Sequence, residues 1–79
     1  MYIEYRETYQ LPLTDQQHSD LFFFIEKQLK DTKIDHSAFK SSYALGVLTI
    51  RFLYNSKQVS RSTIDSVIAS SIKTITAHQ

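Results

Sequence analysis

The sequence predicts a small α+β domain with the element order β-α-β-β-α, in which two helices pack on one face of a mostly antiparallel sheet. Three observations carry this prediction. Residues 3–11 alternate between apolar and polar side chains, residues 47–54 are rich in β-branched and aromatic side chains, and two further segments repeat apolar residues at helical spacing. The 79 residues leave room for one core, so residues 1–79 are expected to form a single domain.

The first strand is predicted from the alternation of residues 3–11. Apolar side chains point to one face and polar side chains to the other: Ile3, Tyr5, Tyr9 and Leu11 against Glu4, Arg6, Thr8 and Gln10. Such a strand packs one face on a core and leaves the other face in water. Pro12 ends the strand because proline fixes its own backbone and has no amide hydrogen to donate.

A helix is predicted from about Asp15 to Lys30. Thr14 and Gln17 have the spacing of a capping box, which satisfies two free amide groups at a helix start. Four apolar residues then fall within an arc of about 100°, the width of a stripe that lies on a sheet: Leu21, Phe22, Ile25 and Leu29. Phe23 projects almost opposite this stripe, where a large ring has no core to enter.

The segment after this helix has weak periodicity. Phe39, Ser41 and Tyr43 alternate with polar neighbours, which favours a strand over residues 39–43, although a loop is the alternative. A hairpin is expected to turn near Ala44 to Gly46, because the only glycine of the chain lies there and glycine tolerates the backbone angles of tight turns.

Residues 47–54, with the sequence VLTIRFLY, give the strongest strand signal in the chain. One side of this strand is apolar and the other is mixed: Leu48, Ile50, Phe52 and Tyr54 against Val47, Thr49, Arg51 and Leu53. A strand with apolar residues on both faces is normally central in its sheet. Because both helices are expected on one side, something else is expected to cover the second face.

The last helix is predicted to begin at Ser60 or Ser62, either of which can cap it, and Asp65 lies three residues after Ser62. Its apolar stripe spans an arc of about 140°: Ile64, Val67, Ile68, Ser71, Ile72 and Ile75. Many of its residues are serine, threonine or β-branched, which have low helix propensity, so packing on the sheet must hold it.

Composition excludes several classes of protein. Hydrophobic residues make up 42% and charged residues 22% of the chain, which is typical of a globular protein. No apolar run approaches the roughly 18 residues of a membrane span, and MYIEYRETY does not resemble a signal peptide, so we expect a cytoplasmic protein that starts at its native Met1. Without cysteine the chain forms no disulfides. Self-association is then the remaining common way to stabilise so small a domain.

No constellation of residues indicates catalysis. One glycine cannot build a phosphate-binding loop. His18, His36 and His78 lack the spacing of a metal site, the serines lack a GxSxG motif, and no two carboxylates form a convincing acid–base pair. We therefore expect no catalytic residues, no cofactor and no metal.

The element order resembles that of small tautomerases, which carry their chemistry on a proline exposed after removal of the initiator methionine. Position 2 of this chain is Tyr2, a bulky residue that keeps Met1 in place. The only proline, Pro12, lies at the far end of the first strand. The resemblance therefore implies at most a catalytically inactive tautomerase-like domain.

A weak nucleic-acid-binding protein is the first alternative function. An open sheet face that carries aromatic and basic residues can stack bases and hold phosphates. The candidates for this role are Tyr2, Arg6, Lys40 and Arg51. Against it, Glu4 shares the same face of the first strand and the net charge of the chain is only +1, so nucleic acid is not the favoured partner.

Protein interaction has the most support. Phe23 and Phe24 extend an apolar patch on the first helix, and a second patch is expected on the open side of the sheet from Leu45, Val47 and Leu53. We therefore predict a non-catalytic interaction module, a homodimer joined through the open sheet face or the sheet edge, with Phe23 and Phe24 available to a partner. Its size and plain composition are typical of small accessory proteins of bacteria, phages or mobile elements, which indicates an inhibitor or adaptor role by analogy.

Overall fold

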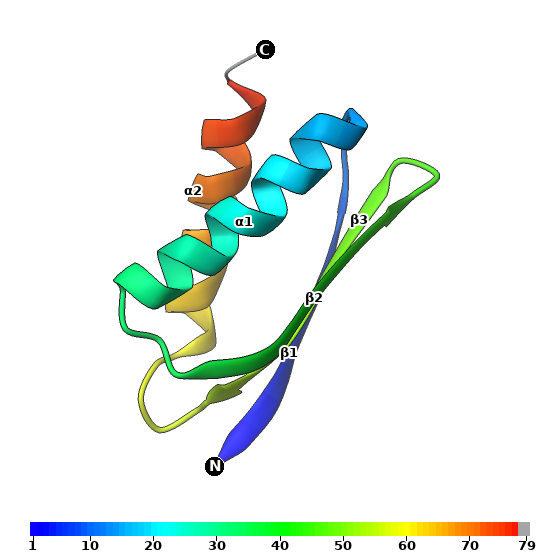
Figure 1. Ribbon diagram of the computed structural model, residues 1–79. Coiled ribbons are helices and arrows are strands. Elements are labelled where there is room, and N and C mark those ends of the chain that lie inside the picture. Colours follow the sequence, from blue (N-terminus) through cyan, green and yellow to red (C-terminus); the bar gives the residue numbers. More distant parts are fainter. Residues whose placement is uncertain (78–79) are drawn as a thin grey trace.

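The computed structural model describes residues 1–77, which form two layers (Figure 1). The elements are β1 (Tyr2–Gln10), α1 (Asp15–Asp31), β2 (His36–Ala44), β3 (Val47–Asn55) and α2 (Arg61–Thr76). The three strands form one antiparallel sheet in the order β1-β3-β2, and both helices cover the same face of it. The predicted fold class and element order are confirmed, and the VLTIRFLY strand is the central one.

The core lies between the sheet and the helix layer. Alternate residues of β3 form its floor and are almost fully buried: Leu48, Ile50, Phe52 and Tyr54. Tyr5 of β1 lies opposite Phe52, and the two rings stack with their centroids 4.9 Å apart. The helices close the core with the stripes that their spacing predicts: Leu21, Ile25 and Leu29 from α1, and Ile64, Ile68 and Ser71 from α2.

Both helix starts use side-chain caps. The Gln17 amide donates to Thr14 Oγ1 at 3.0 Å, and the Thr14 amide donates to Gln17 Oε1 at 2.8 Å, so the predicted capping box is formed. α2 begins after Ser60, whose hydroxyl accepts from the Thr63 amide. Of the two serines that can cap this helix, the structure therefore uses Ser60.

β2 is a strand, and it is longer than residues 39–43. It begins at His36, and its pairing with β3 is interrupted by a bulge between Ser37 and Lys40. Ala38 has a φ of +56° at this bulge, a left-handed angle that non-glycine residues rarely adopt. The bulge breaks the period-two alternation, which explains why the sequence signal of this strand is weak.

The β2–β3 hairpin turns at Leu45 and Gly46, as predicted. Ala44 pairs with Val47, so the loop has two residues, and both have positive φ values of +54° and +76°. Two positive φ values in a two-residue loop are the mark of a type I′ turn, which favours asparagine followed by glycine. Leu45 occupies the asparagine position with a fully exposed side chain.

Leu45→Asn is expected to raise the free energy of unfolding by about 0.5 to 1 kcal/mol, because asparagine adopts positive φ at lower cost than leucine. Urea unfolding followed by circular dichroism measures the gain. Leu45→Ala is the matched control, since it removes the exposed side chain but keeps a Cβ-bearing residue poorly suited to this angle. An equal gain from both variants would assign the effect to loss of the exposed leucine and not to the backbone.

Candidate interaction surfaces

The outer side of the helix layer carries an exposed aromatic ring. Phe23 is 64% exposed, as its position opposite the core stripe of α1 predicts. Its ring meets that of Phe22 edge to face at 5.3 Å, and Phe22 in turn packs on Phe39 of β2. Phe24 is half-buried and faces α2. Phe23 is therefore a large apolar side chain that is exposed to solvent.

Two hollows lie along the line where α1 meets α2, on either side of Phe24. One has a volume of about 340 Å³ and is lined by Phe23, Phe24 and Ile75 with Asp20 and Lys27. The other, of about 400 Å³, is lined by Phe24 and Val67 together with small or polar side chains: Gln28, Ser66, Ser70, Ser71 and Thr74. We call Phe23, Phe24, Val67 and Ile75 the helix seam.

The second face of the sheet is open, and strand register arranges its side chains in rows. Arg6 of β1 lies opposite Arg51 of β3, and Lys40 of β2 lies opposite Arg51 on the other side. Three cations from three strands therefore form one row across the sheet, called here the cation row. Arg51 Nε lies 3.6 Å from Glu4 Oε2, and this is the one ion pair made by the cation row within residues 1–77.

The expected apolar patch on this face does not form. Leu45 lies at the tip of the hairpin and not on the strands. Val47 and Leu53 are half-buried and 38% exposed, respectively, but they lie six residues apart on β3, about 20 Å along the strand. Thr49 and Arg51 lie between them. The three apolar residues are dispersed because Leu45 lies in the turn and Val47 and Leu53 lie at opposite ends of β3.

Tyr2 lies at one end of the open face, two rows from Arg6. Its hydroxyl donates to the carboxylate of Asp35, and this bond raises the pKa of Tyr2 above its usual value. Asp35 joins the sheet just before β2, since its carbonyl accepts from the Asn55 amide. Tyr2 is thus tied to the far edge of the sheet and does not join the cation row.

Both outer edges of the sheet are interrupted. The Leu11 amide donates to Gly46 O and the Ser56 amide donates to Met1 O. The backbone amides and carbonyls of odd-numbered residues in β1 therefore bond to β3, and those of even-numbered residues point away from the sheet at its outer edge. Arg61 of α2 donates from Nη2 to the outward carbonyl of Arg6 at 3.3 Å. β2 is interrupted by the bulge at Ala38. Charged side chains and bulges are common devices that keep sheet edges from pairing with other chains.

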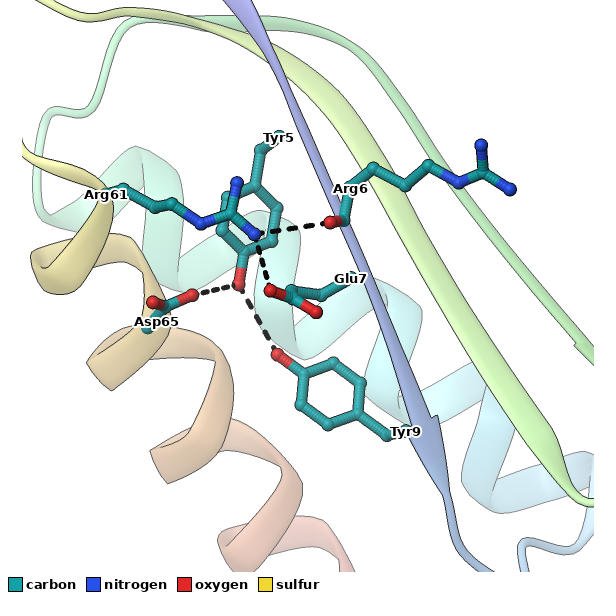
Figure 2. Close-up of polar contacts among 6 residues, drawn as sticks. All are labelled: Tyr5, Arg6, Glu7, Tyr9, Arg61 and Asp65. Carbon is teal, nitrogen blue, oxygen red and sulfur yellow. Dashed lines mark hydrogen bonds and ion pairs between the residues drawn. The ribbon is translucent and has the colours of Figure 1, made fainter.

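The sequence does not predict the polar cluster that lies between β1 and α2. Figure 2 shows Tyr5 and Tyr9 with their hydroxyls directed at α2, where the Tyr5 hydroxyl donates to Asp65 Oδ1 at 2.6 Å. Arg61 lies over the Tyr5 ring, 4.7 Å from its centroid, and pairs with Glu7. The one signal of this cluster in the sequence is Glu7, a charged residue on the otherwise apolar side of the first strand.

The cluster holds its hydroxyl groups in the protonated form. Burial and the bond to Asp65 raise the pKa of Tyr5 far above the usual value for tyrosine, and burial also raises the pKa of Tyr9. The Arg61 pKa is raised by its bond to Glu7. Tyr5 therefore acts as a permanent hydrogen-bond donor that fixes α2 on the sheet.

The histidines and carboxylates do not converge in the part of the chain that the structure describes. His18 hydrogen-bonds to Ser41 at 3.1 Å, and His36 Nδ1 lies 2.9 Å from the carbonyl oxygen of Ile34. His78 lies outside the described residues. Within residues 1–77, no group of three histidine, cysteine, aspartate or glutamate residues is placed to hold a metal ion. None of the described helices is long and apolar enough to cross a membrane.

Comparison with known proteins gives no relative from which a function can be transferred. No protein-family model, curated protein or solved structure matches the chain. The surfaces described above are therefore the basis for any functional assignment.

Proposed function

We propose that this chain is a non-catalytic protein-interaction module that forms a homodimer through its helix layer. The observation that carries the proposal is the 64% exposure of Phe23 beside the hollows of the helix seam. A large aromatic ring next to an apolar hollow is typical of the anchor residues that dominate protein interfaces. An accessory role, as an inhibitor or adaptor, fits such a module.

The helix layer is a better dimer interface than the sheet. Two open faces stacked on each other would bring two cation rows together, and like charges repel in a desolvated interface. Pairing through β1 would have to displace Arg61 from the carbonyl of Arg6, and the outer edge of β2 is bulged. The helix seam has neither obstacle, since its four residues are apolar and the charged side chains beside them, Asp20 and Lys27, have opposite signs.

A two-fold dimer buries the Phe23 ring of both copies. In a two-fold dimer the same patch is used twice, so Phe23 of each copy enters the hollow beside Phe24 and Ile75 of the other. The short side chains of Ser66, Ser70 and Thr74 leave room on α2 for the partner helix to approach. A domain of 79 residues has a small core and therefore a low free energy of unfolding. Burying this surface in a dimer raises it.

The test is the solution mass, measured by light scattering coupled to size exclusion. The wild-type chain is expected at twice its 9.2 kDa mass at micromolar concentration, in low and high salt alike, because the interface is apolar. Phe23→Ser is expected to shift the dimer–monomer midpoint at least about tenfold to higher concentration, since each dimer loses two buried rings.

Leu45→Ser is the matched control, because Leu45 is also a fully exposed hydrophobe but lies at the hairpin tip. It is expected to leave the dimer intact. A wild-type monomer at these concentrations would rule out the dimer. Equal weakening by both variants would show non-specific association of exposed hydrophobes and not an interface at the helix seam.

A further inference from the structure

The cation row brings like charges close together, which lowers the stability of the protein, and the fold does not need these charges to form. Arg6 and Arg51 lie directly opposite each other, as do Lys40 and Arg51, and like charges in directly opposed strand positions destabilise a sheet. Glu4 pairs with Arg51, and within residues 1–77 neither the Arg6 nor the Lys40 side chain has an acidic partner. A local arrangement that lowers stability is expected mainly where function requires it.

The register of the β2–β3 hairpin places Lys40 in this row, and a bulge lies directly beside it. Ser37 lies opposite Leu53 and Lys40 opposite Arg51, so Ala38 and Phe39 together face one residue of β3. From the turn to Lys40 the pairing is unbroken, so alternation along the strand places Ala44, Ser42 and Lys40 on the open face. Phe39 packs on the core, Lys40 lies on the open face, and Figure 2 shows the Arg6 side chain directed to that same side of the sheet. Bulges are over-represented next to functional sites, which fits the position of this one beside the cation row.

The neighbouring row supplies hydroxyl groups. Thr8, Thr49 and Ser42 lie opposite one another, one row along the strands from the cations. Lys40, Arg51, Thr49 and Ser42 line a hollow of about 200 Å³, and Lys40 and Arg51 also border a second one of about 190 Å³. Two cations and two hydroxyls around one small hollow are groups that bind phosphate oxygens.

We propose that the open sheet face binds the phosphate backbone of single-stranded nucleic acid. Three cations spread over about 10 Å across the strands match a chain of negative charges better than an isolated anion. The open face of this sheet has no helix to enter a duplex groove, whereas open sheets bind extended single strands. The contacts are to the backbone, so recognition does not depend on base sequence. This site does not require the dimer proposed above, which uses the opposite layer.

The experiment is fluorescence anisotropy with a labelled mixed-sequence RNA single strand, titrated at several salt concentrations. With three phosphate contacts, the logarithm of the association constant is expected to fall with the logarithm of salt concentration with a slope of about −2. Arg6→Gln, Lys40→Gln and Arg51→Gln are each expected to weaken binding about fivefold at 0.1 M salt. Glu4→Gln removes the negative charge beside Arg51 and is expected to tighten binding about two- to fivefold.

Lys30→Gln is the matched control, because it makes the same change of charge on α1, in the opposite layer. It is expected to leave the affinity within about twofold, since α1 covers the other face of the sheet and the core lies between it and the cation row. Arg6→Thr adds a readout on the free protein. It removes one repulsive pair and is expected to raise the midpoint of thermal unfolding at low salt while weakening RNA binding.

Three outcomes would overturn the proposal. The first is the absence of salt-dependent binding to the single strand while circular dichroism shows a folded protein. The second is equal or tighter binding to the duplex formed with the complementary strand, which would assign the face to double helices. The third is displacement by polyglutamate at the same charge concentration as RNA, which would indicate an acidic protein partner.

Discussion

Phe52→Ala is expected to lower the free energy of unfolding by about 3 to 5 kcal/mol, the usual cost of deleting a buried aromatic ring. Phe52 is 1% exposed and lies in the central strand. Its ring stacks on Tyr5 and lies 5.8 Å from the ring of Phe39, which links all three strands on the core side. No other side chain in the described part of the sheet joins both outer strands through ring contacts. Deleting it leaves a cavity that the rigid strands cannot close.

The total stability of a chain of this length is roughly 4 to 12 kcal/mol, so this one substitution removes a large share of it. Urea unfolding followed by circular dichroism gives the change. Phe52→Leu is the control, because it keeps an apolar side chain of intermediate volume and is expected to cost less than half as much. A loss below about 1 kcal/mol for Phe52→Ala would mean that the three strands do not depend on this ring.

The sequence predicts best those helices and strands in which apolar side chains repeat at a regular spacing without interruption. The alternation of β1 identifies its two faces, and the stripe of α1 correctly predicts that Phe23 lies on the outer side of the helix. Because these patterns are local, they follow from backbone geometry alone. β2 lacks such a pattern because the Ala38 bulge shifts its phase within the strand.

The functional surfaces depend on register, which the sequence does not specify in the same way. Arg6, Arg51 and Lys40 are assigned to one face from the sequence, but their alignment in one row requires the β1–β3 pairing and the register set by the β2–β3 hairpin. Val47 and Leu53, by contrast, are kept apart by their spacing along β3, so the apolar patch that was expected there does not form. Long-range pairing therefore brings cations that are dispersed in the sequence into one row across the sheet.

The cluster around Tyr5 escapes prediction for a related reason. Asp65 and Arg61 are ordinary polar residues in the first turns of α2, and nothing in their spacing connects them to β1. Only the packing of α2 over β1 brings Asp65 to the Tyr5 hydroxyl and Arg61 to Glu7. The inward position of Glu7 is the single local sign of such a partner, because an unpaired charge facing a core is costly.

Tyr5→Phe is expected to lower the free energy of unfolding near neutral pH by about 1.5 to 3 kcal/mol, since it removes a buried hydrogen bond to a carboxylate. Asp65→Asn keeps an oxygen acceptor for the Tyr5 hydroxyl and is expected to cost less than half as much. Comparison of the two separates the hydrogen bond from the charge of Asp65. An undiminished stability in Tyr5→Phe would show that the hydroxyl does not hold α2 to the sheet.

The same substitution is expected to change the response to alkali. The pKa of Tyr5 is raised in the folded protein by burial and by the bond to Asp65, whereas an unfolded tyrosine titrates near its usual pKa of about 10. The folded state therefore keeps a proton that the unfolded state releases. The stabilisation is complete below about pH 10 and is lost at up to about 1.4 kcal/mol per pH unit as the pH rises further.

Urea unfolding between pH 8 and pH 11 tests this expectation, with Tyr5→Phe compared with the wild-type chain. The variant starts from a lower stability but is expected to lose less of it above pH 10, so the two curves converge. Tyr9→Phe is the comparison: burial also raises the pKa of Tyr9, so this variant is expected to lose less stability above pH 10 as well, but its cost near neutral pH is expected to be smaller because Tyr9 is not the group that donates to Asp65. Parallel curves for wild type and Tyr5→Phe would assign the alkaline loss to other groups and would leave Tyr5 as a purely structural donor.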